Sequence, residues 1–301
     1  MKLAFSNVAC LDWDLATLFA KAKEFGYEGV ELVSLGGQGH LPDLPQLKAD
    51  PAAVVKLAVD AGVQIVCLAT EAAFSSANPH EVAANQQTVR EYVDLAAALK
   101  CPYVRVRSGK LTRTWRGTPE QRDRVKARIG QALHALAPYA VEHGVTIVIE
   151  NGGDFPDSPS AWYFVDAADS PAVRCCWNPL TGRTATERPT LSVPRLGSKI
   201  ALIRVADAKL DEHGGIRESV LPGQGEVDVH SLVQLLKGIA YQGFLLFDWP
   251  RQANPSLAGA AEALPAAATY LQGLLKEQPV QLTAYKGDKF KPRQGREFLK
   301  T

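Results

Sequence analysis

The sequence lacks several features that would place it in other classes of protein. It has no continuous apolar run of about 18 residues, the length that a membrane-spanning helix needs. The opening stretch MKLAFS is too short an apolar segment for a signal peptide. The formal net charge is only +1, so no strong field draws the chain to nucleic acid or to an anionic membrane. We therefore expect neither nucleic acid nor membrane as a partner.

Cysteine is also scarce, and its spacing fits neither disulfides nor a metal site. The five cysteines are Cys10, Cys67, Cys101, Cys175 and Cys176. Their number is odd, and the adjacent pair Cys175-Cys176 lies inside an apolar run, which is typical of small core residues. This usage predicts a reducing, cytoplasmic setting.

Short apolar runs instead alternate with long amphipathic segments along most of the 301 residues, of which 46% are hydrophobic. The runs predict eight strands: Leu3–Phe5, Gly29–Val33, Val63–Leu68, Tyr103–Arg107, Val145–Glu150, Val173–Trp177, Ile200–Val205 and Phe244–Asp248. The clearest helical patterns between them are Leu15–Phe25, Ala52–Ala61, His80–Leu99, Pro119–His143, His230–Ile239 and Ala258–Lys276. Regular alternation of this kind predicts parallel pairing, and eight strands would close into an α/β barrel, a (β/α)₈ TIM barrel.

The connecting loops support a barrel over its main rival, an open doubly wound sheet. Helix-to-strand connections are short and contain glycine or proline, whereas strand-to-helix connections are long and polar. In a barrel the long connections gather at the C-terminal face, where active sites lie. The first strand-to-helix turn, SNVACLDWDLA, has no glycine-rich phosphate fingerprint of the kind that an open dinucleotide-binding sheet carries.

Periodicity stops after Lys276, which predicts one barrel domain over residues 1–276 and a basic tail over residues 277–301. The tail is expected to pack on its own barrel or on a partner subunit. A homo-oligomer is therefore an open alternative.

Charged and polar residues stand at the ends of the later predicted strands. They are Arg105 and Arg107 (YVRVR), Glu150 (IVIEN), Asn178 (CCWNP), Arg204 and Asp207 (LIRVADAK) and Asp248 (LLFDWP). An ionised Glu150 at the mouth of a buried strand needs a cation or hydrogen-bond donors to face it. Glu31 in GVELV could face inwards or outwards. The set as a whole predicts a functional site.

The same motifs resemble the xylose isomerase-like superfamily, and in particular its sugar phosphate isomerase/epimerase group. IVIEN, RVADAK, PGQGEVDVHSLVQLL and YQGFLLFDWP carry the resemblance, which covers about residues 1–276. It implies a divalent ion, commonly Mn²⁺ or Mg²⁺, bound by Glu, Asp, His and Glu at the last four strand ends. The two Glu residues would shuttle a proton next to a carbonyl group.

This chain departs from that ligand set at three of the four places. Glu150 matches, but Asn178 replaces an Asp, Arg204 replaces the His, and Asp248 replaces the second Glu. Glu150, Asn178 and Asp248 could still bind a hard cation through oxygen, whereas a guanidinium has no lone pair for a metal. The sequence therefore slightly favours no metal over a single Mn²⁺ or Mg²⁺, with Arg204 as the cation that faces Glu150.

Two functions of different classes follow. The first is an isomerase or epimerase of a sugar, sugar phosphate or keto acid, with Glu150 or Asp248 as base and a lyase or dehydratase as a close variant. Arg204 and Arg107 would orient the substrate, and Asn178, Asp207, Lys209 and Trp115 would also contact it. The second is a non-catalytic or degenerate barrel that binds a sugar-like ligand. The histidines, none of which closes a predicted strand, disfavour the multi-metal endonucleases of the same superfamily.

Overall fold

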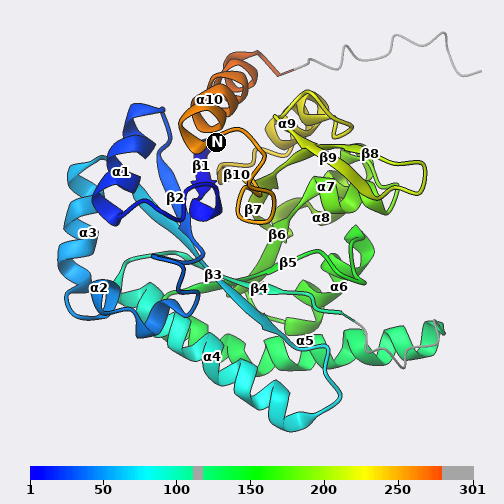
Figure 1. Cartoon of the computed structure of the whole chain (residues 1–301). Coiled ribbons are helices and arrows are strands. Elements are labelled where there is room, and N and C mark those ends of the chain that lie inside the picture. Colours follow the sequence, from blue (N-terminus) through cyan, green and yellow to red (C-terminus); the bar gives the residue numbers. More distant parts are fainter. Residues whose placement is uncertain (111–117, 280–301) are drawn as a thin grey trace, which may run out of the picture.

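The computed structural model describes residues 1–110 and 118–279 and confirms the predicted barrel (Figure 1). Its parallel strands form a closed ring in the order β1-β10-β7-β6-β5-β4-β3-β2. The first strand closes the ring because it pairs with β10 on one side and with β2 on the other. The predicted tail lies almost wholly outside the described residues, so the domain boundary at residue 276 stays a prediction.

The barrel strands agree with the predicted runs to within a residue or two at most ends. They are β1 (Lys2–Ser6), β2 (Gly29–Leu32), β3 (Gln64–Ala73), β4 (Tyr103–Arg107), β5 (Thr146–Glu150), β6 (Val173–Trp177), β7 (Ile200–Val205) and β10 (Phe244–Phe247). The largest difference is at β3, which continues to Ala73 and so lifts Glu71 above the barrel.

Helices cover the outside of the barrel (Figure 1). They are α1 (Leu15–Glu24), α2 (Pro45–Lys48), α3 (Pro51–Asp60), α4 (Pro79–Ala98), α5 (Pro119–Glu142), α6 (Ser158–Ala168), α7 (Pro179–Thr184), α8 (Pro189–Leu196), α9 (Val229–Gly238) and α10 (Ala260–Lys276), with short 3₁₀ turns at Asn7–Ala9, Leu41–Asp43 and Gly197–Lys199. Several start at side-chain caps: Asp14, Asp50 and Asp228 each accept a hydrogen bond from the backbone N–H three residues later.

Two regions contain more structure than the sequence predicted. Helices α6, α7 and α8 fill the segments on either side of β6, where proline and serine interrupt the periodicity. The long connection after β7 contains an antiparallel hairpin, β8 (Asp207–Leu210) and β9 (Ile216–Val220), which lies outside the barrel ring.

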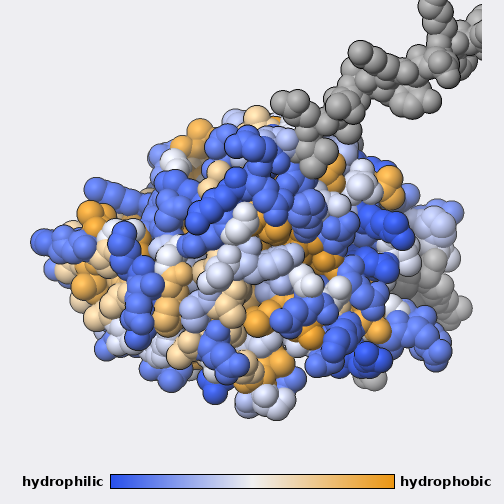
Figure 2. Space-filling model, turned by 90° about the horizontal axis from the view of Figure 1, so that it is seen from above, coloured by the Kyte–Doolittle hydropathy of each residue, from blue (hydrophilic) through white to orange (hydrophobic). Residues whose placement is uncertain are grey.

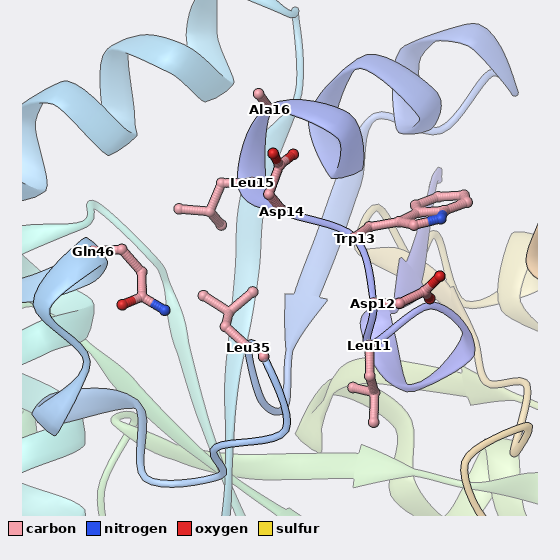
Figure 3. Close-up of a pocket in the computed structure, with 9 residues that line it drawn as sticks. Leu11, Asp12, Trp13, Asp14, Leu15, Ala16, Leu35 and Gln46 are labelled. Atoms are coloured by element: carbon pink, nitrogen blue, oxygen red, sulfur yellow. The ribbon is translucent and has the colours of Figure 1, made fainter.

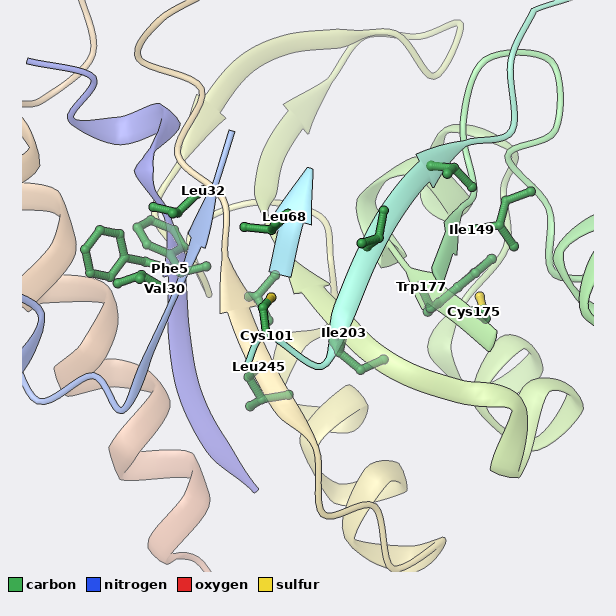
Figure 4. Packing of buried hydrophobic residues seen from close by; sticks show 14 of the residues in the cluster. Phe5, Val30, Leu32, Leu68, Cys101, Ile149, Cys175, Trp177, Ile203 and Leu245 are labelled. Carbon is green, nitrogen blue, oxygen red and sulfur yellow. The ribbon is translucent and has the colours of Figure 1, made fainter. Parts of the chain in front are cut away.

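The core has two layers because alternate strand residues face opposite sides of the barrel wall. Outward-facing residues such as Phe5, Val30 and Ile203 pack with the helices in one large cluster (Figure 4). A smaller cluster fills the barrel itself and includes Ala4, Val66, Val148, Cys176, Leu202 and Leu246. Adjacent Cys175 and Cys176 belong to the outer and inner clusters respectively, and all five cysteines are free and buried, as the core interpretation predicts.

The face in Figure 2 carries mostly hydrophilic residues, with hydrophobic ones scattered between them in small groups. Within the described part of the chain, no helix has the length and apolarity to cross a membrane.

Candidate active site at the barrel mouth

Strand alternation brings the charged residues into one layer above the inner apolar cluster. Glu150, Arg204 and Asp248 each come two residues after a member of that cluster, namely Val148, Leu202 and Leu246. Arg105 likewise follows Tyr103, which packs against the cluster from below. Because the side-chain period of a strand is two, each of these charged side chains points into the barrel one layer nearer its C-terminal mouth.

Arg204 lies at the centre of this layer and is held by acids from three strands. Its Nη1 donates to both carboxylate oxygens of Glu31, at 2.9 Å each, and its Nε donates to Oδ2 of Asp248 at 3.0 Å. Glu150 Oε1 lies 3.5 Å from the same Nε. Glu31 is fully buried, and its contacts with Arg204 and Arg105 show that it faces the barrel interior.

The closest partner of Glu150 is Arg105, whereas the sequence predicted Arg204. Nη1 of Arg105 donates to Oε2 of Glu150 at 2.7 Å, which is shorter than the 3.5 Å contact with Arg204. Arg105 also lies 3.5 Å from Glu31. A guanidinium does face Glu150, as expected, but Arg105 on β4 makes a closer contact than Arg204. Two arginines and three carboxylates thus form one connected buried array.

The array fixes the protonation of its members. Burial on its own would raise the pKa of Glu150, but Arg204, then Arg105 and Arg107, and the amide of Asn178 outweigh it and lower that pKa to about 2. Burial would lower the pKa of Arg204, but Asp248, Glu31 and Glu150 hold it well above the ordinary value. Glu150 is therefore an anion at neutral pH and a weak base.

The donors present here do not fit the divalent ion that the resemblance implies. Oδ1 of Asn178 already accepts from the backbone N–H groups of Leu180 and Thr181 and so caps α7, while Nδ2 of Asn178 faces Glu150 at 3.3 Å. Arg204 Nε stands between Glu150 and Asp248, where its charge opposes a cation. Among the residues that the structure describes, no group of three or more His, Cys, Asp or Glu side chains could hold a metal ion.

A cavity of about 440 Å³ opens directly above the array, and we call it the barrel-mouth cavity. It is lined by Val8, Val33, Glu71, Arg105, Arg107, Glu150, Arg204, Asp248, Pro250, Gln252 and Ala253. In residues 1–110 and 118–279, the hydrogen bonds of Arg204 use Nε and Nη1, and that of Arg105 uses Nη1. Among the described residues, Nη2 of Arg204 has no hydrogen-bond partner and is left for a ligand. Nη2 of Arg105 has one contact, with Oε1 of Glu71 at 3.9 Å, which is too long for a hydrogen bond, so it too can donate to a ligand.

The other predicted contact residues do not all reach this cavity. Arg107 does, but it is half-exposed and forms a two-point ion pair with Glu71, at 2.6 and 2.8 Å. Lys209 pairs with Glu218 across the β8–β9 hairpin. Trp115 lies outside the described residues. Asp207 and Lys209 are absent from the lining of the cavity, so their predicted role in substrate binding has no support from its geometry.

Asp207 instead anchors the segment that carries the PGQGEVD motif. Its carboxylate accepts hydrogen bonds from the N–H groups of Ala208, Gly223, Gly225 and Val227, at 2.9 to 3.0 Å. Gly225 leaves no room for a β-carbon, which would collide with Asp207 and with the carbonyl of Ala208. The motif is therefore explained by a tight turn that wraps a buried carboxylate.

A separate cavity of about 510 Å³ lies beside the mouth, between the segments that follow β1 and β2. Figure 3 shows Leu11, Leu15 and Leu35 around it, with Gln46 on one side. Its lining is mainly apolar and shares no residue with the barrel-mouth cavity.

Three residues of the site were not assigned a role from the sequence: Glu31, Glu71 and Arg105. A signal existed for Arg105, because alternation in YVRVR puts it on the same face as Arg107 and one layer deeper. Glu31 is two residues after Gly29, which faces the barrel interior, but β2 is short and has a bulge at Val30/Glu31 that obscures the alternation. No such signal in the sequence pointed to Glu71, because the third strand was expected to end at Leu68.

Comparisons with solved structures give the same fold at low sequence identity. D-psicose 3-epimerase is 14% identical with a TM-score of 0.74, and the match covers 92% of this chain and 100% of that one. A probable 3-DHS dehydratase of Bacillus anthracis is 16% identical with a TM-score of 0.73, and the match covers 90% of this chain and 99% of that one. The IolI protein with a bound zinc atom is 18% identical with a TM-score of 0.76, and the match covers 91% of this chain and 98% of that one. Comparison with curated protein sequences finds no significant match.

At the level of the family, residues 19–272 match the profile described as xylose isomerase-like TIM barrel. The match spans most of the chain and includes β2 through β10. This chain belongs to the xylose isomerase-like TIM barrel family.

Proposed function

We propose that this protein moves a proton at a carbon next to the carbonyl group of a small sugar, sugar phosphate or keto acid, and that two arginines act in place of a metal ion. The observation that carries the proposal is Arg204, held between Glu31 and Asp248 under the barrel-mouth cavity. Solved structures of the same fold include D-psicose 3-epimerase, 3-keto-D-glucoside 4-epimerase and a probable 3-DHS dehydratase, and these activities support this class of chemistry.

The arginines would bind the carbonyl oxygen. The Nη2 groups of Arg105 and Arg204 can donate hydrogen bonds to an oxygen in the cavity, and both guanidinium groups are fixed by buried carboxylates. When the neighbouring carbon loses a proton, the electron pair of the C–H bond forms the enolate and negative charge collects on that oxygen. A rigid cation at this point stabilises the developing charge without reorganising.

Asp248 is the better placed of the two predicted bases. Its side chain is 21% exposed and opens to the cavity, whereas that of Glu150 is 8% exposed and is held by Arg105. Glu150, with its pKa of about 2, would serve to hold Arg105 rather than to accept the proton. From the enolate, return of a proton to the opposite face of the same carbon gives epimerisation. Protonation of the former carbonyl carbon, with loss of the proton from the neighbouring hydroxyl so that a carbonyl forms there, gives isomerisation. Loss of a β-hydroxyl as water, with the proton supplied by a general acid, gives dehydration.

Solvent exchange tests this proposal. The protein is incubated in D₂O with a panel of ketoses and keto acids, and deuterium at the carbon next to the carbonyl is measured by NMR. We expect exchange with at least one compound, a fall of about 100-fold or more in Asp248→Asn, and no change in Asp211→Asn, which lies in the turn of the hairpin away from the cavity.

Chelation separates the arginine mechanism from a metal mechanism. Exchange that survives EDTA supports the proposal, and exchange that EDTA abolishes and Mn²⁺ restores contradicts it. If no compound of the panel exchanges, the second candidate is favoured: a barrel that binds a sugar-like ligand without catalysis. This second candidate is supported by the ion pairs that Glu150 already forms with Arg105 and Arg204.

A further inference from the structure

A second, smaller cavity adjoins the barrel-mouth cavity at the ends of β4 and β5, and we call it the rim cavity. It has a volume of about 260 Å³ and is lined by Glu71, Arg107, Ser108, Gly109, Lys110, Glu150, Asn151, Gly152 and Gly153. Glu71, Arg107 and Glu150 line both cavities, so the two spaces meet at the Glu71–Arg107 ion pair.

Glu71 is held at this junction by arginines on both sides. Its carboxylate accepts from Nε and Nη2 of Arg107 at 2.6 and 2.8 Å, and its Oε1 lies 3.9 Å from Nη2 of Arg105. The Arg105 side chain is 1% exposed, whereas that of Glu71 is 72% exposed. A largely solvated carboxylate thus lies against a rim guanidinium and within reach of one in the barrel mouth.

The two arginines around Glu71 differ in how firmly they are held. Arg105 is fixed by Glu150 and Glu31, whereas Arg107 extends half-exposed from the end of β4 and pairs with Glu71. Lys110 lies in the rim cavity, its methylene chain against Gly153, and no described carboxylate forms an ion pair with its amino group. If Glu71 swings out to solvent, Arg107 and Lys110 face the rim cavity. Among the described residues of the lining, Glu150 is then the one remaining carboxylate, and it is already paired with Arg105.

We propose that the rim cavity is a subsite for an anionic group of the ligand, and that Glu71 occupies the place of that anion until the ligand displaces it. The arrangement of Arg107 suits either a carboxylate or a phosphate ester, because its Nε and Nη2 present two parallel donors. Displacement of Glu71 costs little because an exposed ion pair contributes little to stability. The inference rests on the proposed function only in that the rest of the ligand would lie in the barrel mouth.

Small anions test the subsite without any knowledge of the substrate. Binding of inorganic phosphate and of acetate is measured by isothermal titration calorimetry for the wild type and for Glu71→Gln. Since the variant lacks the internal competitor, it should bind one or both anions about tenfold more tightly. Whichever anion gains more shows which group the subsite prefers.

A matched control separates this effect from a general change in charge. Glu218→Gln also removes an exposed carboxylate that pairs with a cation, Lys209, but outside both cavities. It should leave anion affinity unchanged. Adding Lys110→Ala to Glu71→Gln should return the affinity to the wild-type level, and because Lys110 is exposed this change should not disturb folding.

Equal affinities in Glu71→Gln and Glu218→Gln would overturn the subsite, and so would a gain that persists after Lys110→Ala. Neither measurement requires turnover. A failure here therefore leaves the solvent-exchange result untouched, and a failure of solvent exchange leaves the anion subsite untouched.

Discussion

At the scale of single residues, the decisive feature is that charges compensate one another inside the barrel. Arg204 is 5% exposed and Arg105 is 1% exposed, so each guanidinium depends on protein carboxylates in place of water. Glu31 contacts both of them, at 2.9 and 3.5 Å. Removal of this one carboxylate charge would leave two buried cations poorly balanced.

Glu31→Gln is therefore expected to lower the free energy of unfolding by about 3 kcal/mol, because it breaks a buried ion pair from one side only. Urea denaturation of the wild type and the variant measures the change. Glu28→Gln is the matched control, since Glu28 pairs with Lys2 at 3.9 Å on the surface, and there the change should be below about 0.5 kcal/mol. Similar losses in the two variants would contradict the array.

The depressed pKa of Glu150 predicts a specific dependence of stability on pH. The folded value of about 2 lies below the ordinary value of 4.5, so the folded state binds the proton less readily than the unfolded chain. The resulting stabilisation is fully present above pH 4.5 and is lost as the pH falls towards 2, and it amounts to roughly 2–4 kcal/mol. Urea denaturation at several pH values should show this loss in the wild type.

In Glu150→Gln the same fall in pH should remove less stability, because the group that titrates is gone. The lowered pKa values of Asp14, Asp157 and Asp228 contribute equally to both proteins. The comparison therefore isolates Glu150. Parallel stability curves for the two proteins between pH 5 and pH 2.5 would show that Glu150 is not held as an anion.

At the scale of elements, the residues that shape the C-terminal face divide into those that line cavities and those that hold loops. Asn178 caps α7 and Asp207 binds the turn at Gly223 to Val227, although both were expected to contact substrate. Asn178 and Asp207 thus stand near the ends of strands because each accepts backbone hydrogen bonds from the loop that follows it.

Asp207→Asn is expected to destabilise the fold by about 2 kcal/mol, because an amide NH₂ group would face N–H donors that now meet a carboxylate oxygen. The thermal unfolding midpoint reports the change. Asp211→Asn serves as control, since Oδ1 alone accepts from His213 and Gly215 and an amide oxygen can replace it. A loss of activity in Asp207→Asn without loss of stability would instead support the predicted contact with substrate.

The sequence predicted the elements of the barrel better than it predicted the contacts of the site. Alternation identified Glu150, Arg204 and Asp248 as neighbours in one layer because strand ends in a barrel converge. It put Arg105 and Arg107 on one face of YVRVR, with Arg105 one layer deeper, but it did not show that Arg105 would pair with Glu150. Helices α7 and α8 were not predicted because they have only six and eight residues and α8 contains Pro194. The segment of α6 begins with SPS, which is typical of a loop, and so hid the helix that follows.

At the scale of the whole molecule, this chain has the barrel of its family and carries an arginine at the barrel mouth. The chain matches zinc-binding IolI over 91% of its length at 18% identity, yet Arg204 occupies the barrel mouth between Glu31, Glu150 and Asp248. A guanidinium and a divalent ion both neutralise carboxylates, but a guanidinium has no lone pair and so cannot itself bind a metal.

Replacing the arginine should therefore allow a metal to bind. In the double variant Asn178→Asp/Arg204→His, four ligands become available and Asp can still cap α7. We expect this variant to bind about one equivalent of Mn²⁺ or Zn²⁺ by calorimetry, whereas Asn178→Asp alone keeps the guanidinium and should bind none. Stoichiometric metal in the wild type, purified without added metal, would contradict the arginine substitution.

The closure of the ring by β1 has a consequence for how the chain folds. Leu3 pairs with Leu245, so the two ends of the barrel wall come from segments more than 240 positions apart. During synthesis β1 can pair with β2 early, but its other neighbour, β10, is made more than 240 residues later. Arg204 lies on β7, which is made before β10, so Glu31 and Glu150 can meet their shared guanidinium earlier. Asp248 directly follows β10 and is therefore the last member to join the ionic array.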